Sequence, residues 1–398
     1  MSSILILGSS CSKNVRVTSI DLSSAGPIRF AGIADTNHRD GTIRPSRLPA
    51  WALAQTDAVA LPIVASMLSG GRMEFDTDAT SIEIDCQLIT VKMGDNPVLP
   101  VTFEVMVDGH IVATHSATNF HLIHTPDPEK IDVTIIPGGR EQVRLTALPA
   151  GMKSVSIWFP SNAGIDIASV TVNDGAIVTA SAPDTRRHWV HYGSSISHCM
   201  ESEHPMGVWP VLAAQRANVN VTNLGLGGQC HLDQFAARMM RDSGADLLSM
   251  KVGINVVNAD TMRDRTLMPA LHGFIDTVRE GAPDTPFIVM SPIFCPAHED
   301  GFGPSMRSAE GIYSRERPTF LGVGALNLRR IRDYIEKVVQ QRRDAGDANI
   351  HYVDGLRLFG PDDITDMPDL LHPNRAGYAR MGDRFHQIAF GDGPFASS

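Results

Sequence analysis

The sequence predicts an α/β protein of two domains: an antiparallel β-sandwich over residues 1–185 and an α/β domain with a five-stranded parallel sheet over residues 186–398. Two patterns predict this division. Alternation of apolar and polar residues with period two recurs before residue 185, and a repeated strand, loop and helix rhythm replaces it afterwards. The length of 398 residues also favours two domains over one.

Short alternating segments predict the first domain, because they are separated by turns rich in Gly, Pro, Asn and Asp. Residues 72–91 are the longest example, and the pair Asp108-Gly109 favours a hairpin turn. Such a series is typical of an antiparallel β-sandwich or jelly roll. Residues 1–68 are less regular, and their one helical pattern covers residues 50–68.

Five apolar segments of the second domain are predicted to be buried strands that alternate with amphipathic helices. Right-handed crossovers of this kind produce a parallel sheet. The strands are predicted at 188–193, 219–225, 245–253, 286–293 and 349–355, and the helices at 207–218, 232–242, 261–281, 321–346 and after 372–377. In such sheets the binding site gathers at the carboxyl ends of the strands.

Polar or glycine-rich clusters follow four of these strands. They are Gly193-Ser194-Ser195, "NLGLGGQ" at 223–229, "GIN" at 253–255 and "DLLHPN" at 369–374. Each cluster alone can be read as a turn, a flexible loop or a helix start. Ordinary turns would not place four such clusters at the same edge of a sheet. We therefore expect the clusters to form a single site.

The clusters contain the groups that acyl transfer by serine requires. Ser195 supplies a hydroxyl at the end of a strand, and His372 is the best base to take its proton. Asp369, three residues before His372, can reach the other ring nitrogen and complete a catalytic triad. The predicted oxyanion hole consists of the backbone N–H groups of Ser195 and Gly228 and the side-chain amide of Asn255.

This ordered set resembles the SGNH (GDSL-type) hydrolases, which are named for the Ser, Gly, Asn and His of four sequence blocks. The resemblance covers most of residues 186–398. It implies a three-layer α/β/α, flavodoxin-like domain, a serine esterase activity, and no cofactor or metal. Two positions depart from the commoner pattern. Ser194 stands where the GDS form has aspartate, and Val256 follows Asn255 where aspartate is more usual.

Within that family, "YGSSI" blocks behind a β-sandwich look like those of carbohydrate esterases that remove acetyl groups from sugars. The resemblance therefore implies a short-chain ester of a carbohydrate or a related small molecule as substrate, with the β-sandwich forming one wall of the cleft. Two alternatives stay open. One is an acyltransferase, or a lipase or thioesterase, that uses the same site. The other is a catalytically inactive carbohydrate-binding protein, which the complete set of groups disfavours.

The N-terminus carries a near copy of the nucleophile block, "ILILGSSCS" at Ile4–Ser12. No Gly-Gly block, GxN or DxxHP follows it at a suitable spacing. We therefore expect Ser9 and Ser10 to form an ordinary turn at the end of a strand, and Ser195 to be the nucleophile.

Four further residues are candidates for contact with substrate. His198 lies close to Ser195 in sequence, although it can equally cap the following loop. The segment 294–320 is long, polar and rich in Gly and Pro, as lids and binding loops often are. It contains His298, Arg307 and Arg315, which are candidates to bind an anionic or sugar substrate; the alternative is a solvated loop.

Composition argues against several classes of function. The net charge of −10 disfavours a nucleic acid partner, and no apolar run has the roughly 20 residues that a membrane helix needs. Without a convincing signal peptide, a cytoplasmic monomer or homo-oligomer is expected.

The five scattered cysteines indicate reduced thiols. Cys199 and Cys230 follow neighbouring blocks and can lie close together, but buried free thiols are expected there rather than a disulfide. The histidines within 110–124 do not form a strong metal motif.

Overall fold

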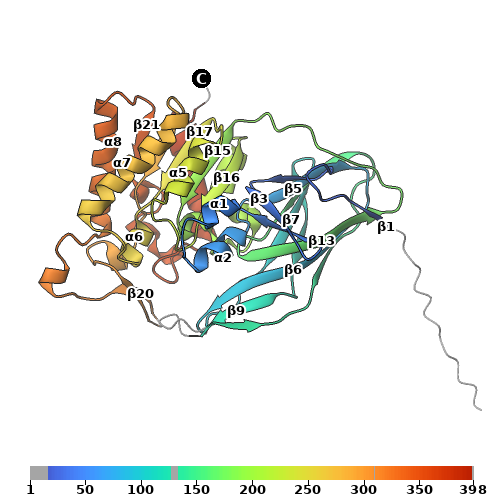
Figure 1. The fold of residues 1–398 in the computed structure, drawn as a ribbon, viewed down its shortest axis with the longest axis horizontal. Coiled ribbons are helices and arrows are strands. Elements are labelled where there is room, and N and C mark those ends of the chain that lie inside the picture. Colours follow the sequence, from blue (N-terminus) through green and yellow to red (C-terminus); the bar gives the residue numbers. More distant parts are fainter. Residues whose placement is uncertain (1–16, 127–132, 309, 397–398) are drawn as a thin grey trace, which may run out of the picture.

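The computed structural model describes residues 17–126, 133–308 and 310–396. A domain of two β-sheets lies beside a layered α/β domain (Figure 1). The predicted fold class is therefore confirmed. Helices α1 (Ala50–Leu53) and α2 (Ala60–Ser66) lie where the two parts meet.

The strands of the first domain form two sheets in the part of the chain described. The larger contains β1 (Val17–Ser19), β3 (Asp35–Arg39), β4 (Thr42–Ser46), β6 (Ile82–Met93), β9 (His121–Thr125), β10 (Thr134–Ile136), β11 (Glu141–Leu145) and β13 (Ala163–Asn173). The smaller contains β2 (Arg29–Ala31), β5 (Arg72–Thr77), β7 (Thr102–Val107), β8 (His110–Ser116), β12 (Lys153–Trp158) and β14 (Val178–Thr179).

The sequence pattern explains why these strands form a sandwich. Along β6 every second side chain is buried, as expected for a strand with one face on a core. The turn between β7 and β8 is the predicted hairpin, with φ of 49° at Asp108 and 83° at Gly109. One pairing differs from the prediction, because β6 and β9 are parallel. Between them the chain crosses to the other sheet to form β7 and β8, and it returns in the original direction.

Residues 50–68 form two short helices rather than one. The break falls at residues 54–59, where the Thr56 hydroxyl accepts a hydrogen bond from the backbone N–H of Ala58 and so competes with helical bonding. The buried side chains of these helices, among them Ala52 and Leu61, belong to the same hydrophobic core as the α/β domain. This segment therefore attaches the β domain to the α/β domain.

The α/β domain is built on a five-stranded parallel sheet in the order β16-β15-β17-β18-β21. These strands are β15 (His188–Gly193), β16 (Asn220–Gly225), β17 (Leu247–Lys251), β18 (Phe287–Met290) and β21 (Ile350–Val353). They are buried almost throughout, because helices cover both faces. The order of the strands reverses at β15, which places a crevice between the carboxyl ends of β15 and β17.

The helices pack in two groups. The main ones are α4 (Trp209–Arg216), α5 (Gln234–Arg241), α7 (Asp264–Gly281), α8 (Leu328–Asp344) and α9 (Arg375–Phe385). α4 packs on α9, whereas α7 packs on α5 and α8. Side chains on opposite faces of β15 pack on different helices. Trp189 stacks on Phe385 of α9 with ring centroids 5.0 Å apart, and Tyr192 stacks on Phe274 of α7 with ring centroids 5.3 Å apart. None of the helices in the described ranges is both long and apolar enough to cross a membrane.

Candidate active site

The four predicted clusters lie at the carboxyl edge of the parallel sheet. β15 ends at Gly193, and Ser195 begins the short helix α3 (Ser195–His198). The hydroxyl of Ser194 caps this helix by accepting a hydrogen bond from the backbone N–H of Ile196. A Cβ atom at Gly193 would lie 2.3 Å from the Ser197 hydroxyl, so only glycine lets α3 turn back this closely over the strand.

Ser195, His372 and Asp369 form a continuous hydrogen-bonded relay. The Oγ of Ser195 lies 2.9 Å from Nε2 of His372, and Nδ1 of His372 lies 2.7 Å from Oδ2 of Asp369. The other oxygen of Asp369 accepts hydrogen bonds from the backbone N–H groups of Leu371 and His372. Asn374 then caps α9 through the backbone N–H of Gly377. The "DLLHPN" segment thus fixes both His372 and the group that orients it.

The electrostatics of the relay favour an ionised carboxylate beside His372. Burial raises the pKa of Asp369, but the hydrogen bonds and the charge of His372 outweigh burial and lower the pKa to about 2. Because an ionised carboxylate can only accept, Nδ1 of His372 must carry the hydrogen between them. Nε2 is then free to accept the proton of Ser195.

Gly228 and Asn255 lie in the loops that follow β16 and β17. Gly228 has a φ of +68°, a conformation that favours glycine and lets the backbone approach a bound group. Asn255, in α6 (Ile254–Asn258), is 3% exposed, and its carboxamide oxygen accepts a hydrogen bond of 3.1 Å from the backbone N–H of Cys230. That contact fixes the amide plane and leaves the NH₂ group of Asn255 as a donor.

His198 does not have the predicted access to substrate. It is fully buried, its Nε2 lies 2.7 Å from the carbonyl oxygen of Ser161, and its Nδ1 accepts a hydrogen bond from the backbone N–H of Gly227. Burial lowers its pKa well below the usual value, so the ring is neutral. His198 therefore joins the loop of Gly228 to the β domain and does not cap the loop that follows it.

A buried arginine connects the β domain to the end of β16, next to the loop that carries Gly228. Arg47 is 1% exposed, and its guanidinium donates to the carbonyl oxygens of Val64 and Met67 in the β domain. The same group donates to the carbonyl oxygens of Asn223 and Gly225 at the end of β16, with distances of 3.1 and 2.5 Å. One side chain thereby ties the loop that carries Gly228 to the β domain.

The segment 294–320 has more structure than the sequence predicts. It contains a 3-10 turn (Pro296–His298) and a hairpin of β19 (Ser305–Ser308) and β20 (Gly311–Ser314). The backbone N–H of Ile312 donates a hydrogen bond of 3.0 Å to the carbonyl oxygen of Asp369. This hairpin is therefore packed against the acid of the relay.

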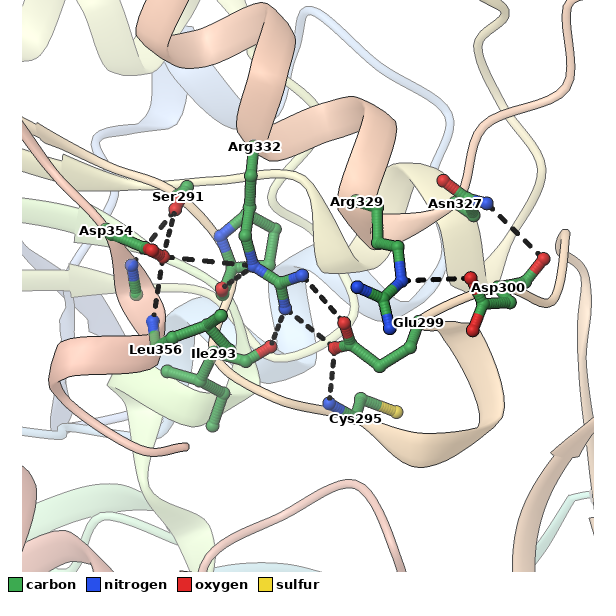
Figure 2. Close-up of polar contacts among 12 residues, drawn as sticks. Ser291, Ile293, Cys295, Glu299, Asp300, Asn327, Arg329, Arg332, Asp354 and Leu356 are labelled. Carbon is green, nitrogen blue, oxygen red and sulfur yellow. Dashed lines mark hydrogen bonds and ion pairs between the residues drawn. The ribbon is translucent and has the colours of Figure 1, made fainter. Parts of the chain in front are cut away.

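A buried ion pair joins the first part of this segment to α8. Figure 2 shows Arg332 of α8 pointing toward Glu299, with which it makes hydrogen bonds of 2.8 and 2.7 Å. Arg332 also donates to the carbonyl oxygens of Pro292 and Ile293. Both charged side chains are less than a tenth exposed, so they satisfy each other rather than a substrate.

The three substrate candidates in the segment lie in different surroundings. His298 is fully buried, with its ring nitrogens 3.2 Å from the carbonyl oxygen of Gly301 and 2.7 Å from the Ser305 hydroxyl, so the prediction that it meets substrate is not supported. Arg307 and Arg315 are exposed. The charge of Arg307 lowers the pKa of His372.

Two residues near His372 were missed by sequence reasoning. Glu201 lies 3.8 Å from Nδ1 of His372, and the hydroxyl of Tyr378 donates a hydrogen bond of 2.8 Å to Glu201. Neither belongs to a recognisable motif. Tyr378 follows the "HPN" segment by one helical turn, and this spacing is the one signal that could have indicated it.

The cysteines in the described ranges are free thiols. Cys199 and Cys230 are both buried and unpaired with each other, as expected for reduced thiols beneath the site. Within the same ranges, no group of three or more His, Cys, Asp or Glu side chains is arranged to hold a metal ion. The N-terminal copy of the nucleophile block, with Ser9 and Ser10, lies outside the described residues.

Solved structures with similar folds span nearly the whole chain. A salicylyl-acyltransferase, SsfX3, from a tetracycline biosynthetic pathway has a TM-score of 0.76 and 23% identity, covering 92% of this chain and 95% of that one. A putative GDSL-like lipase from Bacteroides ovatus has a TM-score of 0.63 and 19% identity, covering 90% and 94%. An active-site mutant of a family two carbohydrate esterase from Clostridium thermocellum has a TM-score of 0.57 and 14% identity, covering 90% and 96%.

At these identities the similarity establishes the shared fold. No curated protein sequence matches the chain. Among protein families, the GDSL-like lipase/acylhydrolase family matches residues 191–380, a range that begins within β15 and ends within α9. The match includes all four sequence blocks and the complete relay. The part of this chain that is similar to the GDSL-like lipase/acylhydrolase family is therefore residues 191–380.

Proposed function

We propose that the protein is a serine esterase that hydrolyses short-chain, acetyl-type esters of a carbohydrate or a related small alcohol. The relay carries this proposal. One hydrogen bond joins Ser195 Oγ to Nε2 of His372, and a second joins Nδ1 of His372 to the Asp369 carboxylate. A hydroxyl with a base at 2.9 Å and an oriented imidazole is the arrangement that acyl transfer requires.

In the proposed reaction, Ser195 Oγ attacks the ester carbonyl carbon and its proton passes to Nε2 of His372. Asp369 stabilises the imidazolium, while the N–H groups of Ser195 and Gly228 and the NH₂ of Asn255 bind the oxyanion. The C–O bond to the alcohol breaks, and the alcohol leaves with the proton from His372. Water then attacks the acyl-enzyme with His372 as base, which releases the acid and regenerates Ser195.

The proposed substrate class rests on analogy with the similar structures, which is weaker support than the site itself. The names of several similar chains include family two carbohydrate esterase and acetyl xylan esterase. One observation favours a second candidate, an acyltransferase: the salicylyl-acyltransferase matches both parts of this chain with a TM-score of 0.76. A transferase would use the same acyl-enzyme and replace water with an alcohol acceptor.

Hydrolysis of p-nitrophenyl acetate, butyrate and octanoate tests the proposal. We expect serine-dependent release of p-nitrophenol with a rate that falls steeply as the acyl chain lengthens. Repeating the assay with an added sugar alcohol separates the second candidate, since a transferase would release p-nitrophenol faster and form a new ester. Fastest release from the octanoate would favour a lipase, and no release from any ester by the folded protein would contradict the esterase.

Two substitutions of Asn255 distinguish an oxyanion donor from a structural amide. Asn255→Asp keeps an oxygen that can accept from Cys230 but removes the NH₂ donor, whereas Asn255→Ala removes both. We expect both variants to lower kcat for p-nitrophenyl acetate by about 10²- to 10³-fold, the usual effect of losing one oxyanion donor. If Asn255 only braces the loop, Asn255→Asp will keep nearly the full kcat while Asn255→Ala loses stability.

A further inference from the structure

A second carboxylate faces the ring nitrogen of His372 that Asp369 already binds. Glu201 lies in the 3-10 turn Met200–Ser202, which follows α3. Its Oε1 is 3.8 Å from Nδ1 of His372, whereas Oδ2 of Asp369 is at 2.7 Å. The imidazole is 12% exposed and the Glu201 side chain 30% exposed. Glu201 therefore acts on the ring through its charge rather than through a short hydrogen bond.

Tyr378 holds Glu201 at this distance. The Tyr378 hydroxyl, on the buried face of α9, donates a hydrogen bond of 2.8 Å to Oε2 of Glu201, which leaves Oε1 on the side of His372. Burial and the neighbouring charge of Glu201 raise the pKa of Tyr378 well above its usual value, so the phenol stays protonated and keeps donating. Cys199, which also feels the charge of Glu201, is kept neutral mainly by burial.

Several elements place charged groups around the imidazole: Asp369 precedes α9, Glu201 follows α3, and Arg307 comes from β19. Burial is the largest influence on the pKa of His372, and it lowers that pKa. The charge of Glu201 comes next and raises it, followed by the hydrogen bond and charge of Asp369, while Arg307 lowers it. The net result is a pKa above the usual value for histidine.

We propose that Glu201 is a positioning residue that acts together with Asp369 as a second carboxylate for His372, and that Tyr378 holds it in place. Neither carboxylate takes a proton in this arrangement. The proton of Ser195 goes to Nε2, and both negative charges stabilise the imidazolium that results. The effect on reaction rate rests on the proposed esterase function, whereas the effect on the titration of His372 does not.

The pH dependence of ester hydrolysis tests this role. Glu201→Gln removes the charge but keeps an oxygen that can accept from Tyr378. His372 must be neutral to act as base, so activity is lost as the pH falls through its pKa. Because the variant lowers that pKa, the acidic limb of kcat/KM for p-nitrophenyl acetate should move down by about one pH unit. The plateau should fall by about 3- to 10-fold.

Glu203→Gln is the matched control, since Glu203 is exposed at the end of the same turn. It should leave the limb and the plateau at their wild-type values. An acidic limb that does not move in Glu201→Gln would overturn the proposal, as would an equal shift in both variants.

A titration that needs no turnover separates this proposal from the proposed function. With ¹³C-labelled histidine, the His372 resonance is assigned by its loss in His372→Gln and is followed against pH. A lower pKa in Glu201→Gln supports the second carboxylate even if the protein hydrolyses no ester. An unchanged pKa in an active esterase contradicts the second carboxylate and leaves the esterase assignment standing.

A double-variant cycle tests whether the two carboxylates share one task. Asp369→Asn alone should retain measurable activity, because Glu201 still stabilises the imidazolium. Adding Glu201→Gln in that background should lower kcat by at least about threefold more than it does in the wild-type protein. Equal effects of Glu201→Gln in the two backgrounds would show that the carboxylates act independently and would overturn the shared role.

Discussion

Ser195→Ala should lower kcat/KM for p-nitrophenyl acetate by on the order of 10⁴-fold or more without changing the fold. The hydroxyl of Ser195 bonds to His372 in the structure, and alanine keeps the backbone N–H that begins α3. The substitution therefore removes the nucleophile and little else. Steady-state kinetics beside a thermal melting curve measure both parts of this prediction.

The matched control for this variant is Ser10→Ala in the N-terminal copy of the motif. It should leave kcat/KM at the wild-type value, because the sequence provides no second base and acid for Ser10. Wild-type turnover by Ser195→Ala would mean that another group is the nucleophile. A simultaneous loss of activity in Ser10→Ala would point to the N-terminal serines.

Arg47→Met should lower the free energy of unfolding by about 3 kcal/mol, the largest stability effect we expect from a residue outside the relay. Burial lowers the pKa of Arg47 to about 9, so the guanidinium is charged at neutral pH. Its hydrogen bonds go to four backbone carbonyl oxygens rather than to a carboxylate. Methionine fills a similar volume but leaves those carbonyl groups without this donor.

Urea unfolding monitored by circular dichroism measures this loss. Arg39→Met is the control, because the Arg39 side chain is 70% exposed and pairs with the exposed Asp40. An exposed pair of this kind contributes at most about 1 kcal/mol. If Arg47→Met costs no more than Arg39→Met, Arg47 does not join the two domains in the way the structure indicates.

The sequence was sufficient to predict the α/β architecture and the relay because both depend on short-range patterns. Buried apolar runs followed by amphipathic helices define a parallel sheet, and such a sheet brings the residues after its strands to one edge. Ser195 and Asn255 lie at the start of short helices that follow strands, and His372 lies just before α9. Asp369 and His372 are only three residues apart, so the carboxylate can reach the imidazole without help from a distant segment.

The contacts that the sequence did not reveal depend on the packing of distant segments. Arg47 reaches Gly225 across the domain junction, and no local pattern distinguishes it from a surface arginine. His198 and His298 were expected near substrate, but both are buried with their ring nitrogens hydrogen-bonded. Glu201 gains its place because α3 ends at a residue in the left-handed conformation, Cys199, which turns the chain back toward α9.

Covalent labelling with an organophosphorus ester such as paraoxon identifies the nucleophile. Ser195 Oγ displaces p-nitrophenolate from phosphorus while His372 takes the proton, and mass spectrometry of the digested protein locates the modified residue. We expect one label on Ser195, none in Ser195→Ala, and much slower labelling in His372→Gln. A label on another residue would show that Ser195 is not the nucleophile, and equal labelling rates with and without His372 would show that His372 is not its base.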